Sequence, residues 1–276
     1  MTYISVSQEL FEQAEANEIF RTEVGSTLHG TGLPGHEDLD LMGITIMPTF
    51  DVLGMDPFEQ VIWRTADGPS VRSTPDDTDL TIYSLKKYLR LAAAGNPSIL
   101  VPLWAPRNKW VKGQDHPFLS NRGVALAALM ANKHLFVSKN AGRKFLGYAE
   151  SQRQRMVDSH DGVRSPRTNR PELIEQFGYD TKFAMHMLRL CIQGTELMTS
   201  GGITLPVPTA LGGDFLRTVR SGEMSYGEIL QWSTTWINAL KAAIDRADHL
   251  PDKADLYSVS MLSKRMHLDF WTSNHN

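Results

Sequence analysis

Cysteine is almost absent from this sequence, and its apolar stretches are short. The one cysteine among 276 residues, Cys191, excludes an internal disulfide and favours a reducing compartment. No apolar run approaches the length of about 20 residues that crosses a bilayer. The first twenty residues contain four glutamates in an amphipathic pattern, whereas a secretory signal begins with basic residues. We therefore expect a cytoplasmic protein with no membrane partner.

Two successive segments of the chain carry opposite excess charge, although the net charge of the whole chain is only −3. Residues 1–106 contain six Lys or Arg against 15 Asp or Glu, and residues 107–190 contain 15 against seven. This asymmetry predicts one surface for metal cations and another for phosphates. Ordinary variation in charge between solvated helices is the alternative explanation.

Strand patterns are confined to the first part of the sequence. Alternating apolar and β-branched residues predict strands in the second half of 18–24 and over 39–47, 61–65 and 79–85. Helical spacing predicts helices at roughly 5–18, 85–94, 98–104, 117–132, 137–157, 171–199, 211–221, 225–248 and 252–265. Strands followed by helices, without alternation, predict an α+β fold with an appended helical domain.

One helix and one loop have clear sequence signals. Ser84 is the predicted N-cap of the helix over 85–94, and Gly95-Asn96-Pro97 is its predicted stop. The polar segment 158–172, with two prolines and three arginines, is predicted to be a mobile loop.

Two aspartates stand at the start of the predicted strand over 39–47, although aspartate is a poor strand former. Residues two apart in a strand point to the same face, so Asp38 and Asp40 share one face. Two such carboxylates repel each other unless one is protonated or a cation lies between them. Mg²⁺ prefers these oxygen ligands, so the pair predicts half of a metal site. Asp79 is the best placed third carboxylate, with Asp76 and Asp77 as competitors.

Gly25 and Ser26 end the strand that precedes these aspartates. A glycine there lets a ligand approach the backbone, and N–H groups with a hydroxyl can hold a phosphate. A phosphate cradle beside a metal site predicts phosphoryl or nucleotidyl transfer. Either motif alone is usually a surface feature, so the prediction rests on their joint order and spacing. Sugar-nucleotide glycosyltransferases also use D-x-D, but the 37 residues before Asp38 are too few for their nucleotide-binding unit.

These residues resemble the G-S-x(n)-D-x-D signature of the polymerase-β-like nucleotidyltransferases. More of the chain resembles one branch, the predicted nucleotidyltransferases associated with RNA ligases. The matching stretches are 79–104, 143–152, 178–190 and, more weakly, 220–232. The resemblance implies a nucleotidyltransferase core with a mixed sheet in residues 1–115, and a helical domain in residues 116–276 that completes the active-site cleft. It also implies transfer of a nucleoside monophosphate from an NTP to a hydroxyl, with release of pyrophosphate.

The resemblance further implies a role for each residue of the two motifs. Gly25 and Ser26 would hold the triphosphate of the NTP. Asp38 and Asp40 would bind two Mg²⁺ or Mn²⁺ ions, and Asp79 would be the third carboxylate, which helps to activate the attacking hydroxyl.

The predicted helix over 171–199 carries a cationic stripe. Lys182, His186 and Arg189 fall at i, i+4 and i+7 on one face, where they would bind the nucleotide if that face is turned to the cleft. The alternatives are a solvated helix face and, for His186, a packed histidine.

Seven further lysines and arginines of the basic segment lie within 143–170. An RNA-binding surface needs such residues, but Phe145 and Tyr148 lie at helical spacing and are predicted to be core residues. A solvated helix and a loop are therefore the preferred interpretation. The cations concerned are Arg143, Lys144, Arg153, Arg155, Arg164, Arg167 and Arg170.

Three functions stay open from the sequence. The favoured one is transfer to an RNA or tRNA end. The alternatives are transfer to a protein or small molecule, as in toxin-like and antibiotic-modifying relatives, and a non-catalytic nucleotide-binding regulatory protein. One departure bears on the choice: the branch usually has an acidic residue after N-P-S-I-L, where this chain has Val101-Pro102. The sequence predicts neither the preferred NTP nor the oligomeric state.

Overall fold

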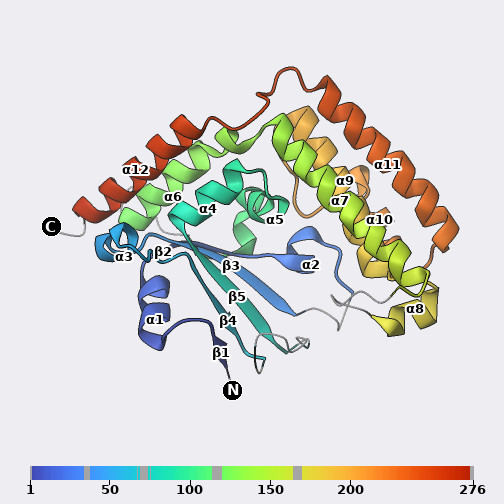
Figure 1. The fold of residues 1–276 in the computed structure, drawn as a ribbon, viewed down its shortest axis with the longest axis horizontal. Coiled ribbons are helices and arrows are strands. Elements are labelled where there is room, and N and C mark those ends of the chain that lie inside the picture. Colours follow the sequence, from blue (N-terminus) through green and yellow to red (C-terminus); the bar gives the residue numbers. More distant parts are fainter. Residues whose placement is uncertain are drawn as a thin grey trace.

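The fold is α+β, as predicted, with a mixed sheet followed by a helical region (Figure 1). The computed structural model describes residues 2–33, 38–66, 68, 74, 76–113, 120–163 and 170–273. The strands are β1 (Tyr3–Ile4), β2 (Glu18–Glu23), β3 (Leu39–Thr45), β4 (Gln60–Arg64), β5 (Thr78–Ser84) and β6 (Trp110–Lys112). Their order in the sheet is β1-β4-β5-β3-β2-β6. The central pair β3 and β5 is parallel, and the other neighbours are antiparallel.

Helices surround this sheet and extend to one side of it. The helices are α1 (Gln8–Ala16), α2 (Gly25–His29), α3 (Thr49–Leu53), α4 (Leu85–Ala93), α5 (Pro97–Leu100), α6 (Asn121–Ala131), α7 (Lys139–His160), α8 (Pro171–Phe177), α9 (Thr181–Ser200), α10 (Gly213–Arg220), α11 (Tyr226–Arg246) and α12 (Leu256–Ser273). Helices α7, α9, α10 and α11 pack together beside the sheet. Helix α12 then returns along α6 and α4 (Figure 1).

Both faces of the sheet are buried. On one face, Leu41 and Leu80 pack with Phe11 of α1. On the other face, Met42 and Ile44 belong to the large core that the sheet shares with the helices. Burial on both faces explains why the β3 sequence is almost continuously apolar after its aspartates.

The last helix closes this core from far along the sequence. Met266 and Phe270 of α12 are buried in the same core as Ile44. Trp271 Nε1 donates a hydrogen bond to the carbonyl oxygen of Met47 at 2.9 Å. Because α6 contacts β2 and α12 contacts α4, helices from beyond residue 116 cover the sheet, and a domain boundary between residues 115 and 116 stays a prediction.

Several predicted elements differ in their bounds. The single helix expected over 171–199 is two helices, because Gly178 adopts φ +78° and the Asp180 side chain then caps α9. The stretch 98–104 is α5 followed by a 3-10 helix over 101–104. The last helix continues to Ser273. A short helix that was not predicted, α2, begins at Gly25.

The predicted mobile loop is helical at both ends, and one aromatic residue predicted to be in the core is exposed. Helix α7 continues to residue 160 and α8 begins at residue 171, while 164–169, with Arg164 and Arg167, lie outside the described residues. Phe145 is buried as predicted, but Tyr148 is 41% exposed. Tyr148 lies at the edge of the buried stripe of α7, so its prediction as a core residue was wrong.

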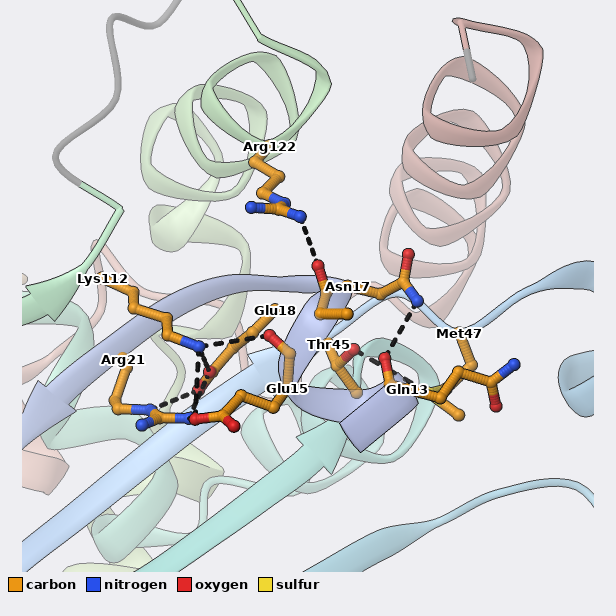
Figure 2. Close-up of polar contacts among 10 residues, drawn as sticks. Gln13, Glu15, Asn17, Glu18, Arg21, Thr45, Met47, Lys112 and Arg122 are labelled. Atoms are coloured by element: carbon orange, nitrogen blue, oxygen red, sulfur yellow. Dashed lines mark hydrogen bonds and ion pairs between the residues drawn. The ribbon is translucent and has the colours of Figure 1, made fainter. Parts of the chain in front are cut away.

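An ion cluster fixes α1 and β6 to β2 (Figure 2). The buried Glu18 carboxylate accepts from Arg21 Nε at 3.0 Å and Nη2 at 2.6 Å, and Lys112 Nζ lies 3.0 Å from it. Glu15 of α1 also pairs with Arg21 Nη2 at 2.9 Å. A Cβ at Gly43 would collide with the Glu18 carboxylate, so a larger residue there would displace a group that the ion cluster holds.

Within the described part of the chain, no helix combines the length and the apolar character needed to cross a bilayer. Cys191 is buried with a free thiol.

Candidate active site

Three carboxylates meet at one end of the parallel strands. Asp40 of β3 and Asp79 of β5 lie directly opposite each other in the register, and Asp38 stands just before β3. One oxygen atom of each carboxylate lies within 4.8 Å of those of the other two. Asp77 instead accepts hydrogen bonds from Thr65 and Thr74. The geometry therefore brings together the three aspartates that the sequence singled out.

The electrostatics of this cluster fit an oxygen-bound divalent cation. Burial, followed by the charges of Asp38 and Asp79, raises the pKa of Asp40 from 3.8 to about 6. Three carboxylates in so small a volume destabilise one another's charged forms, and a divalent cation would offset that repulsion.

Arg64 of β4 holds the third carboxylate in place. Its Nε donates to Asp79 Oδ1 at 2.7 Å and its Nη2 donates to Oδ2 at 3.2 Å, which is the two-pronged geometry of a strong Arg–carboxylate pair. A further bond runs from Nη1 to the carbonyl of Gly68 at 3.2 Å. Arg64 was not predicted as a site residue, although a charged residue within an apolar predicted strand was a usable signal.

Helix α2 begins against the carboxylates. Gly25 adopts φ +67°, and a Cβ on it would collide with the Asp40 carboxylate, so only glycine allows this approach. The backbone amide of Val24 donates to the carbonyl of Asp40 at 2.8 Å. Gly25 and Ser26 line the same cavity, of about 510 Å³, as Asp40 and Asp79.

Helix α9 covers the cavity from the helical side. His186 and Arg189 line the cavity. Burial and the charge of Arg170 lower the pKa of Lys182, while Asp38 and Asp40 act in the opposite direction. The charges of the carboxylates and those of a positive region that includes Arg170 and Arg220 therefore both act on Lys182. Neither Arg170 nor Arg220 was predicted as a site residue.

Arg189 also connects α9 to α2. Its Nη1 donates to His29 Nε2 and to Gln193 Oε1 at 3.3 Å. The Gln193 side-chain amide nitrogen lies 3.0 Å from His29 Nδ1, so both nitrogens of the His29 ring face donor groups. Burial and the charge of Arg189 lower the pKa of His29 well below 6.5, so His29 is neutral. His29 and Gln193 were not predicted, because their roles follow from tertiary packing.

His186 has a similar electrostatic environment. Burial, then Arg189 and Lys182, lower its pKa well below 6.5, so the ring that faces the cavity is neutral at physiological pH. Val101 and Pro102 line the same cavity, which places the departure from the branch pattern at the site itself.

Comparison with known proteins agrees with this geometry. A sequence model described as the RNA repair pathway DNA polymerase beta family matches residues 5–220. An uncharacterized 38.9 kDa protein from the nrdC-mobD intergenic region of Enterobacteria phage T4 is 28% identical over 134 residues, which are 49% of this chain. The match covers only 37% of the phage protein's length. No solved structure matches the chain significantly.

Proposed function

Because the chain belongs to the RNA repair pathway DNA polymerase beta family, we propose that it transfers a nucleoside monophosphate from an NTP to a hydroxyl at an RNA or tRNA end. Polymerase-β-like nucleotidyltransferases generally use divalent metals. The observation that carries the proposal is the cluster of Asp38, Asp40 and Asp79. Gly25 and Ser26 adjoin it in the same cavity.

The carboxylates would supply the chemistry of the transfer. Asp38, Asp40 and Asp79 would hold two Mg²⁺ or Mn²⁺ ions, which stabilise the attacking and leaving oxygens when bound. The acceptor hydroxyl oxygen forms a bond to the α-phosphorus while the bond from that phosphorus to pyrophosphate breaks. Asp79 accepts the hydroxyl proton, and Arg64 fixes the orientation of Asp79 by its two hydrogen bonds.

The triphosphate would lie between α2 and α9. Gly25 and Ser26 offer backbone N–H groups and a hydroxyl to its oxygens. Lys182 balances its negative charge, and the neutral His186 donates a hydrogen bond. Arg189 both lines the cavity and positions α2 through His29.

The test uses each of the four NTPs labelled at the α-phosphate, with Mg²⁺ or Mn²⁺ and an RNA that ends in a free 3′ hydroxyl. We expect label in RNA with the wild type and none with an Asp38→Asn, Asp40→Asn double variant. Asp76→Asn is the matched control, because Asp76 is exposed and outside the cluster; it should keep full activity.

Other outcomes of this labelling experiment would favour one of the alternative functions. A cell extract supplied as acceptor, then separated into RNA, protein and small molecules, identifies the acceptor class. Label only in protein or small molecules would contradict the RNA acceptor but keep the transfer. Nucleotide binding without label in any fraction would point to a regulatory protein, and full activity of the double variant would contradict the metal site.

A further inference from the structure

A second cavity, of about 550 Å³, follows one side of α7, and none of its lining residues lines the cavity at the carboxylates. We call it the α7 groove. It is lined by Arg143, Lys144, Gly147, Tyr148, Ser151, Gln152 and Arg155. Its residues combine positive charge with an aromatic ring that is 41% exposed.

Several polar groups of the α7 groove lack a partner within the protein. Among the described residues, neither Lys144 nor Arg155 forms an ion pair, whereas Arg143 pairs with Asp252 at 2.8 Å. The Gln152 side-chain oxygen is buried and accepts no hydrogen bond from any described residue. Two free cations and an unpaired amide oxygen around an exposed ring are groups that a charged, hydrogen-bonding ligand would satisfy.

The groove opens on the same side of the α7–α9 pair as the cationic stripe of the candidate active site. Gly142 faces Met198 and Phe145 faces Gly194, which shows that the two helices run antiparallel. Consider the residues of each helix that face the partner helix. In an antiparallel pair, the residues that come directly before them in the sequence lie on the same side of the pair for both helices. On α7, each of three groove residues directly precedes a buried residue: Lys144 before Phe145, Tyr148 before Ala149 and Arg155 before Met156. On α9, the same holds for the stripe: Lys182 before Phe183, His186 before Met187 and Arg189 before Leu190.

The groove also begins level with the active site. Because Phe145 faces Gly194, Arg155 lies abreast of residue 184, between Lys182 and His186. From there to Lys144 the groove extends roughly 16 Å at about 1.5 Å per residue. About five stacked nucleotides span that distance at about 3.4 Å each.

We propose that the α7 groove binds the single-stranded segment of the RNA acceptor next to the end that reacts, an inference that rests on the proposed function. Lys144 and Arg155 bind backbone phosphates. Tyr148 stacks on a base, and Gln152 accepts a hydrogen bond from a base amine. An exposed aromatic ring between cations along one line fits a nucleic-acid strand better than it fits an acidic protein surface.

The first experiment measures binding without NTP or metal, so that it does not depend on catalysis. A fluorescent single-stranded RNA of 15 nucleotides is titrated with the protein and followed by anisotropy. Lys144→Glu and Tyr148→Ala should each weaken binding by at least about fivefold, and Tyr148→Phe should retain it. A plot of log affinity against log salt concentration has a negative slope, and Lys144→Glu should make this slope shallower by about 0.7.

Matched controls lie on α12, which contributes no residue to the lining of the groove. Lys264 and Tyr257 are exposed there, so Lys264→Glu and Tyr257→Ala should bind RNA like the wild type. Equal losses in groove and control variants, or no RNA binding by the wild type, would overturn the inference.

The second experiment separates this inference from the proposed function. Transfer to the 15-nucleotide RNA is compared with transfer to a dinucleotide, and the groove variants should raise KM more for the longer acceptor. Groove-dependent RNA binding without any nucleotide transfer would refute the proposed function and keep the groove. Transfer with the same KM for the longer RNA in wild type and groove variants would overturn the groove and keep the function.

Discussion

At the scale of single residues, Asp40 is the carboxyl group whose ionisation the fold opposes most clearly. Its pKa is about 6 in the folded protein against 3.8 unperturbed. A raised carboxyl pKa contributes stability that is present below the unfolded value and is lost as pH rises through the folded value. The metal-free protein should therefore lose stability from this residue between about pH 4 and pH 7.

This dependence can be measured by urea unfolding with a chelator. Between about pH 5 and pH 7.5, the free energy of unfolding of the wild type should fall by about 1 kcal/mol more than that of Asp40→Asn. Asp76→Asn, at an exposed position, should behave like the wild type. Identical pH profiles for the wild type and Asp40→Asn would mean that Asp40 ionises normally in the folded protein.

Arg64 is the residue whose effect on the reaction would be indirect, since it contacts Asp79. Arg64→Lys keeps the charge but loses the two-pronged contact. The transfer rate should fall by about 10- to 100-fold, with little change in the KM for the NTP. Arg90→Lys, at an exposed pair with Glu59, is the control for the same substitution. An unchanged rate for Arg64→Lys would show that Arg64 does not position the carboxylate.

Residue spacing alone predicted part of this site. Asp38 and Asp40 follow from period-two geometry, which is local. The pairing of Asp79 with Asp40, and of Arg64 with Asp79, depends on strand register, which is set by partners distant in sequence. His29 meets Arg189 only after α2 packs on α9, so no local pattern pointed to it.

At the scale of elements, the ion cluster at β2 (Figure 2) holds the edge of the sheet. Arg21→Met would leave the buried Glu18 without its closest partner and should lower the free energy of unfolding by about 3 kcal/mol. Urea unfolding of Arg21→Met, Glu18→Gln and the double variant measures the coupling between them. Additive effects would contradict a coupled pair.

Elements with strong end signals were predicted well. The Ser84 hydroxyl accepts from the Lys87 amide at 3.2 Å and caps α4, as expected, and α4 ends just before Gly95. The break between α8 and α9 was missed because apolar residues continue across Gly178. The edge strands β1 and β6 have two and three residues, which is too short for an alternating pattern to be recognised.

At the scale of the whole molecule, the candidate site joins the two oppositely charged parts of the chain. The carboxylates come from the acidic first 106 residues, and Lys182 comes from the basic segment. Their charges act on each other across the cavity. The sequence indicated both charges, but only the packing of α9 over the strand ends brings them to one place.

The return of α12 over α6 and α4 has a consequence for synthesis. A ribosome makes α12 after every other described element, so the carboxylates and α9 emerge while the core that includes Ile44 still lacks Met266 and Phe270. Domains generally fold from the N-terminus during translation, but here the first part of the chain has to wait for the last helix. Activity would therefore appear only after the ribosome has passed α12, and nascent chains that stop earlier would expose apolar surface to chaperones and proteases.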